Sequence, residues 1–210
     1  QGRRLAFNRS PGTGPGMVFL GGFKSDMEGS KARFLEDWAR TQGRAFLRFD
    51  YSGHGVSGGA FEAGCIGDWR DDARAVIEAQ TTGPQVLVGS SMGGWISLLL
   101  AREMPRRIAG LVTIAAAPDF TVTTWESELT EAQRDEVRRT GLTRLLPFPT
   151  RLLQGTADTD VAPQIAIGLL DHATGPDIRL VLVKGADHRF STPDCLALIA
   201  RSVEDVLART

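Results

Sequence analysis

The sequence contains few cysteines and histidines, no long apolar run and no excess of charge of either sign. Two cysteines, Cys65 and Cys195, are too few for a cysteine-rich zinc site or a disulfide scaffold, and we therefore expect a reduced, cytoplasmic protein. No stretch of about 18 apolar residues is present, so we expect no membrane span. Lys and Arg together number 24 against 25 for Asp and Glu, whereas proteins that hold nucleic acid through its phosphates usually carry a basic excess. The composition thus argues against nucleic acid as a partner and leaves the oligomeric state open.

Short apolar runs alternate with longer amphipathic stretches along the chain. The runs predict strands at 17–20, 45–50, 86–89, 111–114, 151–153 and 179–183, and residues 5–7 can add an edge strand. The stretches between them predict helices at 32–41, 69–79, 93–102, 164–172 and 195–208. Apolar strands separated by helices indicate an α/β fold with a doubly wound, mostly parallel sheet covered on both faces. The 210 residues suit a single domain, and such sheets bind ligands at the carboxyl ends of their strands.

Residues 119–149 interrupt this alternation, because they contain no predicted strand. The capping-box pattern Thr130-Glu131-Ala132-Gln133 predicts the start of a helix that Gly141 can end. That helix would be charged on almost every side. We expect a short cap above the strand ends, which is either an ordinary exposed connection or a lid, and its place over the site favours the lid.

A strand, a tight turn and a helix meet at Gly89-Ser90-Ser91-Met92-Gly93, which matches the nucleophile-elbow pattern G-x-S-x-G. In that pattern the serine occupies a strained turn, so that its hydroxyl projects above the sheet. The flanking glycines remove side chains that would collide with the neighbouring strand and helix, and the helix N-terminus favours developing negative charge. We therefore predict that Ser91 is a nucleophile rather than part of a purely structural turn.

A serine nucleophile needs a histidine base, and the chain offers three histidines. In this fold the base follows the nucleophile in the chain, which leaves His172 and His188. His172 lies inside a predicted helix and is more typical of a surface or capping residue. His188 follows the strand 179–183 after a short turn, at the correct edge of the sheet, and we predict that it is the general base. His54 is interpreted as a turn residue near the site.

The base needs a carboxylate that orients it, and four aspartates are candidates. Asp158 follows the strand 151–153, one strand before the histidine, and is the favoured acid. Asp160, two residues later, and Asp119, after the strand 111–114, stay open as alternatives. Asp187 is adjacent to His188 and would rarely reach the imidazole nitrogen that faces away from the serine. For each of them the alternative role is the capping of a turn.

Two backbone N–H groups should stabilise the oxyanion of the reaction. One belongs to Met92, which follows the nucleophile. The other is predicted at Phe23, in the loop that follows the strand 17–20 and begins with Gly21-Gly22. The segment Asp50-Tyr51-Ser52-Gly53-His54-Gly55 ends the next strand, and we interpret it as a structural turn that supports the site.

Several separate segments, in order along the chain, resemble those of one family of serine hydrolases with the α/β-hydrolase fold. That family contains palmitoyl-protein thioesterase, mycophenolic-acid acyl-glucuronide esterase and their bacterial relatives. The segments are Phe23-Lys24-Ser25-Asp26-Met27, Gly29-Ser30-Lys31-Ala32, Arg48-Phe49-Asp50-Tyr51-Ser52-Gly53, Trp69-Arg70, Gly83-Pro84-Gln85, Gly89 to Trp95 and Asp187-His188-Arg189. The resemblance implies the same triad of Ser91, Asp158 and His188, in an enzyme without cofactor or metal that acts on a small-molecule acyl ester or thioester.

The chain departs from this family in two places. The family has a longer stretch between the strands near Ala115 and Arg151, and we interpret the shortness around Leu145-Leu146-Pro147 as a missing segment. A Cα spacing of about 3.8 Å at every step from 142 to 149 would contradict that interpretation. Ala162-Pro163 replaces the tryptophan that the family carries after the loop of the acid, which affects the shape of the acyl pocket.

Two other functions remain as alternatives. The same triad could act on an amide, a lactone or a carbon–carbon bond, because fold and motif do not separate these reactions. A non-catalytic binding protein with the same fold would be expected to lack a triad member, whereas all three residues are present in the sequence.

Overall fold

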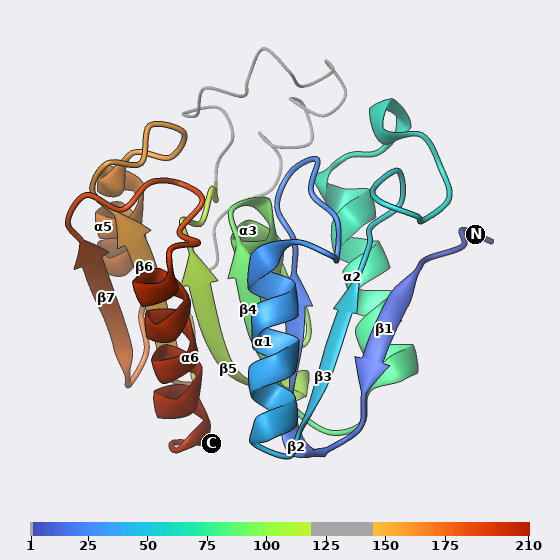
Figure 1. Cartoon of the computed structure of the whole chain (residues 1–210), viewed down its shortest axis with the longest axis horizontal. Helices are drawn as coiled ribbons and strands as arrows, with labels where there is room; N and C mark the ends of the chain where they lie inside the picture. Colours follow the sequence, from blue (N-terminus) through green and yellow to red (C-terminus); the bar gives the residue numbers. More distant parts are fainter. Residues whose placement is uncertain (1, 119–144) are drawn as a thin grey trace.

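The computed structural model describes residues 2–118 and 145–210, which form a seven-stranded sheet between two layers of helices (Figure 1). The strands are β1 (Phe7–Ser10), β2 (Thr13–Leu20), β3 (Arg44–Phe49), β4 (Gln85–Ser90), β5 (Ile108–Ile114), β6 (Thr150–Gly155) and β7 (Ile178–Val183). The helices are α1 (Ser30–Thr41), α2 (Ile66–Gln80), α3 (Met92–Glu103), α5 (Pro163–His172) and α6 (Pro193–Leu207), with short 3-10 helices at Phe61–Ala63 and Pro105–Arg107.

The strands lie in the order β1-β3-β2-β4-β5-β6-β7, and all pairs except β1–β3 are parallel. This confirms the predicted α/β class, the doubly wound, mostly parallel sheet and the six predicted runs, which form the parallel strands β2 to β7. The edge strand begins at Phe7, later than predicted. Ala6 instead bonds to the loop after β3, since its carbonyl accepts from the Asp50 N–H at 2.9 Å and its N–H donates to Ser57 Oγ at 2.8 Å.

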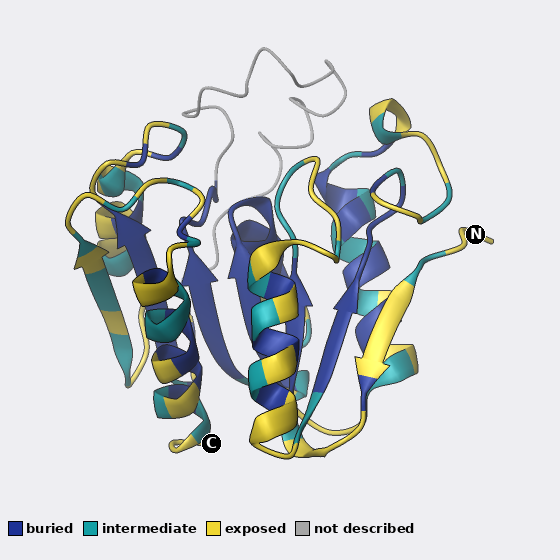
Figure 2. Ribbon diagram, in the orientation of Figure 1, coloured by how far each residue is buried: buried dark blue, intermediate teal, exposed yellow. Residues whose placement is uncertain are grey.

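The apolar strands supply both faces of the sheet, because successive side chains point to opposite sides. Val18 and Leu20 of β2 belong to the core beneath α2, α3 and α5, whereas Met17 and Phe19 pack in the core beneath α1 and α6. The inner strands are therefore buried along most of their length, while β1 at the edge is largely exposed (Figure 2). Helix α3 is buried from Met92 to Ala101, which explains its almost continuous apolar sequence.

The carboxyl ends of the six parallel strands meet at one edge of the sheet, the upper edge in Figure 1. The cap was predicted at residues 119–149, and most of it, including the helix from Thr130 to Gly141 and Asp119, lies outside the described residues, so the choice between a lid and an exposed connection stays a prediction. Residues 142–144 also lie outside them, so the missing segment expected around Leu145-Leu146-Pro147 and the single-domain assignment stay predictions. Downstream, Leu146 and Phe148 are buried in the core, and the Leu146 N–H donates to the Thr174 carbonyl at 2.8 Å. Within 2–118 and 145–210, no helix has both the length and the apolar character needed to cross a bilayer.

Candidate active site

Ser91 occupies the turn between β4 and α3 with a left-handed backbone, φ +55° and ψ −117°. A serine rarely adopts this conformation, so the turn is strained. It is held by a hydrogen bond from the Ser91 N–H to the Ile114 carbonyl, 2.8 Å, and by the Gly94 N–H, which donates to the Ser91 carbonyl at 2.9 Å. The side chain is buried, and Ser91 Oγ has no hydrogen-bond partner among the described residues.

The glycines on either side of Ser91 are required by close backbone contacts. A Cβ added to Gly89 would lie 2.3 Å from the Gly93 carbonyl oxygen, and one added to Gly93 would lie 2.1 Å from that of Leu20. These are the contacts with helix and neighbouring strand that the sequence pattern predicts.

His188 and Asp158 come together at the ends of two adjacent strands. Asp158 lies in the loop after β6 and His188 in the loop after β7, and His188 Nδ1 is 2.9 Å from Asp158 Oδ2. Because a carboxylate accepts, Nδ1 carries the proton and Nε2 is left as the nitrogen that can accept one. His188 lines the same cavity of about 380 Å³ as Ser91.

The carboxylate of Asp158 is fully buried and receives four hydrogen bonds. Oδ2 accepts from His188 Nδ1 and from Gln154 Nε2, each at 2.9 Å. Oδ1 accepts from the Asp160 N–H at 2.9 Å and the Val161 N–H at 2.8 Å. Burial by itself would raise the pKa of Asp158, but the hydrogen bonds from His188 and Val161 outweigh it and lower that pKa, so the carboxyl stays ionised.

The other acid and base candidates occupy different positions. Ligand atoms of Asp160, Asp158 and His188 lie within 4.8 Å of one another, a spacing that a metal ion could use, but the hydrogen bond from His188 goes to Asp158. Asp187 Oδ1 accepts from the Phe190 N–H at 3.1 Å, which is the turn-capping role. His172 is exposed at the end of α5.

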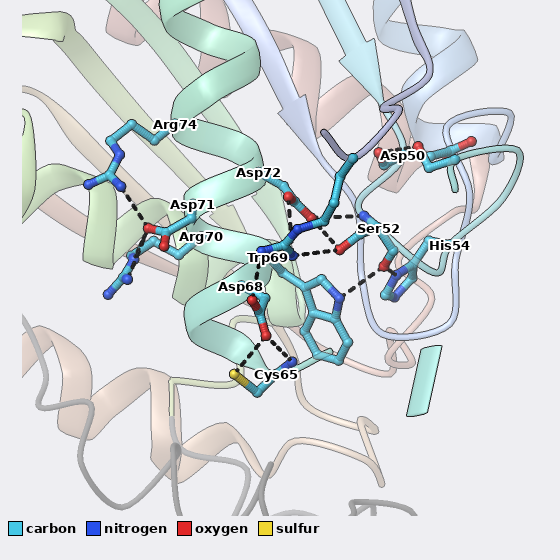
Figure 3. A network of polar contacts seen from close by, with 12 residues as sticks. Asp50, Ser52, His54, Cys65, Asp68, Trp69, Arg70, Asp71, Asp72 and Arg74 are labelled. Atoms are coloured by element: carbon cyan, nitrogen blue, oxygen red, sulfur yellow. Dashed lines mark hydrogen bonds and ion pairs between the residues drawn. The ribbon is translucent and has the colours of Figure 1, made fainter. Parts of the chain in front are cut away.

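His54 lies in the turn after β3, where it was interpreted as a supporting residue. It is buried, and its Nδ1 donates to the Ser52 carbonyl at 3.2 Å. Trp69 Nε1 on α2 donates to the same carbonyl at 3.1 Å, and the Trp69 and His54 rings meet edge to face at 5.0 Å (Figure 3). Burial lowers the pKa of His54, which favours the neutral ring. Asp72, also on α2, accepts from both the N–H and the hydroxyl of Ser52.

The loop after β2, which carries Phe23, lies against the elbow. A Cβ placed on Gly22 would be in ordinary contact, 3.4 Å, with Ser91 Cβ. The Phe23 ring packs edge to face on Phe61 at 4.9 Å, and Phe23 lines the cavity beside Ser91. Met92, the other predicted oxyanion residue, is the first residue of α3 and is fully buried.

Three further residues in this region were given no role of their own from the sequence, although Asp50 lies in the segment 50–55 that was interpreted as a supporting turn. The buried Asp50 carboxylate accepts the Met27 N–H at 2.7 Å and the Val56 N–H at 3.0 Å, and thereby ties the Phe23 loop to the turn after β3. Gln154 donates to Asp158, and its only signal in the sequence is a polar residue near the end of an apolar strand.

Lys31 is the third of these residues. It lines the cavity and donates to the Arg189 carbonyl beside His188, and burial lowers the pKa of Lys31.

Comparisons with known proteins agree with this architecture. The family Hydrolase_4, described as Serine aminopeptidase, S33, matches residues 17–127. Palmitoyl-protein thioesterase ABHD10, mitochondrial, of Rattus norvegicus is 32% identical over 97% of this chain and 78% of its own length. The solved structure of alpha/beta hydrolase domain-containing protein 10 from mouse is 30% identical, covers 98% of this chain and 94% of its own, and superposes with a TM-score of 0.90. A solved structure from Agrobacterium vitis S4 is 35% identical over 98% of this chain and 94% of its own, with a TM-score of 0.85. The α/β-hydrolase fold and the resemblance to the thioesterase family are thereby confirmed.

Proposed function

The chain belongs to the α/β-hydrolase family Hydrolase_4, and we propose that it is a serine hydrolase that cleaves carboxylic esters or thioesters through an acyl-enzyme. The observation that carries the proposal is the hydrogen bond between His188 and Asp158 at the cavity that Ser91 lines. An oriented imidazole that shares a cavity with a serine in a strained strand-to-helix turn supports a role of His188 in activating the hydroxyl.

In this mechanism Ser91 Oγ attacks the carbonyl carbon of the substrate, and His188 Nε2 accepts the hydroxyl proton. His188 then gives that proton to the leaving alcohol or thiol, and a water molecule repeats the sequence to release the acid. Asp158 fixes the tautomer with the proton on Nδ1 and stabilises the imidazolium ion. The N–H groups of Met92 and Phe23 donate to the oxyanion, supported by the start of α3 behind Met92.

Ester or thioester substrates are favoured over other carbonyl compounds by similarity to the relatives. The rat relative is named a palmitoyl-protein thioesterase, and an acyl thioester is therefore the first substrate class to test. An amide, lactone or carbon–carbon bond hydrolase would use the same residues, and a binding protein would use none of them for turnover. Small-molecule acyl compounds are the proposed partners, and nucleic acid is not among them.

The compartment is also a proposal. Cys65 and Cys195 are free thiols, which suits the reduced cytoplasm predicted from the sequence. The rat relative is named as mitochondrial, and a fractionation experiment is needed to choose for this chain.

The decisive experiment combines turnover with the chemistry of Ser91. We expect a 4-nitrophenyl ester to give a burst of nitrophenol, and an organophosphonate probe to add once per chain at Ser91 rather than at its neighbour Ser90. Ser91→Ala should lose both the adduct and ester turnover by several orders of magnitude, whereas Ser202→Ala, a matched change on the distant helix α6, should lose neither. Retention of most turnover in Ser91→Ala would reject the mechanism. A panel of oxygen esters, thioesters and amides of increasing chain length then separates the substrate classes.

A further inference from the structure

Gln154 is a fully buried polar side chain in an apolar part of the sheet. It is the second-to-last residue of β6, and alternation places it on the same face as Leu152, which belongs to the core under α3 and α5. An amide buried in such a core is costly unless its hydrogen bonds are made. The hydrogen bonds of the Gln154 amide therefore indicate its role.

The amide group of Gln154 is surrounded by acceptors. Its Nε2 lies 2.9 Å from Asp158 Oδ2, 3.1 Å from the Val161 carbonyl and 3.3 Å from the Gly155 carbonyl. Exchanging the amide oxygen and nitrogen would bring an oxygen to all three acceptors, so the NH₂ group must face them. Gln154 Oε1, in contrast, has no hydrogen-bond partner among the described residues. The orientation of the Gln154 side chain is therefore set by the hydrogen bonds that its NH₂ group donates.

The donation to Asp158 completes the shell of that carboxylate. A carboxylate offers two lone pairs on each oxygen, and Asp158 receives two donors on each. Gln154 is the donor on Oδ2 that is independent of His188. Rotation of the carboxylate away from His188 would break the bond to Gln154 as well, and this resists such rotation.

We propose that Gln154 is a positioning residue for the triad: its amide N–H holds Asp158 Oδ2 at the angle that receives Nδ1–H of His188. The inference rests on the proposed function, because it gives Gln154 a role only through Asp158 and His188. A purely structural role would instead use the bonds to the Gly155 and Val161 carbonyls to close the loop after β6. The two roles differ in whether loss of the donor disturbs His188.

The test compares two substitutions that differ in their ability to donate. Gln154→Met keeps the length of the side chain but cannot donate to Asp158. We expect kcat to fall about 10- to 100-fold with little change in KM, by analogy with the loss of a hydrogen-bond partner behind a metal ligand. In Gln154→Glu a protonated carboxyl can still donate, but an ionised one repels Asp158. The ratio of its kcat to that of the wild type should therefore rise toward one as the pH falls, whereas the ratio for Gln154→Met stays low throughout. Asp158, Asp160 and His188, whose ligand atoms lie within 4.8 Å of one another, are present in every variant, so Gln154→Met serves as the reference for the pH dependence of Gln154→Glu.

A spectroscopic measurement separates this proposal from the proposed function. The Nδ1 proton of His188, hydrogen-bonded to a carboxylate, should give a low-field proton resonance in the wild type and equally in Ser91→Ala. Gln154→Met should shift or broaden that resonance in either background, and Leu152→Val, a packing change on the same face of β6, should leave it and kcat unchanged. An unchanged resonance in folded Gln154→Met, or equal kcat losses in Gln154→Met and Leu152→Val, would overturn the proposal. Turnover by Ser91→Ala would reject the serine mechanism instead, and the resonance would still report on Gln154.

Discussion

His188 Nδ1 lies 2.9 Å from Asp158 Oδ2, although the two residues are thirty positions apart in the chain. The register of the sheet sets this distance, because β6 and β7 are parallel neighbours that end together, with Gly155 opposite Val183. Beyond the strands, the Ala157 N–H donates to the Ala186 carbonyl at 3.0 Å and joins the two loops. The relative placement of His188 and Asp158 is therefore a property of the fold rather than of two flexible loops.

Replacement of Asp158 by Asn should abolish most activity while the protein stays folded. An amide NH₂ in place of Oδ2 would favour the imidazole tautomer with its proton on Nε2, which cannot take the proton of Ser91. By analogy with other serine triads we expect kcat to fall by about 10⁴-fold. Steady-state kinetics and a thermal melt measure the two effects.

Asp160→Asn is the matched control for that substitution. The Nδ1 hydrogen bond of His188 goes to Asp158 rather than to Asp160, so we expect kcat of Asp160→Asn within about threefold of the wild type. A larger loss in Asp160→Asn than in Asp158→Asn would transfer the role of the acid to Asp160.

The contact between the two loops predicts that a side chain at Gly155 lowers both stability and activity. A Cβ at this position would lie 2.2 Å from the Ala186 carbonyl oxygen, so Gly155→Ala must separate the loops that carry Asp158 and His188. We expect a loss of about 1–3 kcal/mol in the free energy of unfolding together with a fall in kcat. Urea unfolding and steady-state kinetics test both.

Gly168→Ala is the matched control, because the same substitution at this position should raise stability instead of lowering it. Gly168 lies within α5, and nothing is within 4 Å of the position of its Cβ. Because alanine has the better helix propensity, the variant should gain about 0.5–1 kcal/mol and keep its activity. Equal effects of the two alanines would show that the close approach at Gly155 is not decisive.

The buried ion pair between Arg48 and Glu36 predicts a large effect on stability. Arg48 Nε donates to Glu36 Oε2 at 2.8 Å, the Ser10 hydroxyl donates to Oε1 at 2.6 Å, and both charged side chains are about 5% exposed or less. Arg48→Met would remove the buried cation and leave the Glu36 carboxylate only the exposed Arg40, 3.6 Å away, at a cost of about 3–5 kcal/mol. The double variant Arg48→Met with Glu36→Leu should recover part of that loss in urea unfolding, whereas additive losses would contradict this account.

The same pair predicts how stability depends on pH. Burial alone would raise the pKa of Glu36, but hydrogen bonds from Ser10 and Arg48 outweigh it and lower that pKa below its usual value of 4.5. Since the folded protein holds the proton more weakly than the unfolded chain, Glu36 stabilises the fold above pH 4.5 and this contribution is lost as the pH falls through the lowered pKa. The stability difference between the wild type and Glu36→Gln should therefore shrink on acidification. A difference that grows in acid would mean that the pKa is raised.

Much of this arrangement could be predicted from the sequence, because it depends on local patterns. Short continuous apolar runs define strands buried on both faces, and the G-x-S-x-G turn marks Ser91. His188 and Asp158 were predictable as residues at the ends of neighbouring strands. The role of Gln154 was not predictable, because a single glutamine in the sequence does not indicate its hydrogen-bond partner. The contact with Asp158 depends on the path of the loop after β6.

The partners of Asp50 could not be predicted from the sequence either, because its two donors belong to two separate loops. Its carboxylate accepts from the Met27 N–H and the Val56 N–H, and an asparagine can replace only one of these two acceptor oxygens. Asp50→Asn should therefore release the loop that carries Phe23 and lower kcat about tenfold, the scale of one weakened oxyanion donor, with little change in KM. Asp37→Asn, an exposed aspartate on α1 paired only with Arg40 among the described residues, is the control and should change neither value. If Asp50→Asn raises KM at constant kcat instead, the loop acts in substrate binding and the Phe23 N–H is not an oxyanion donor.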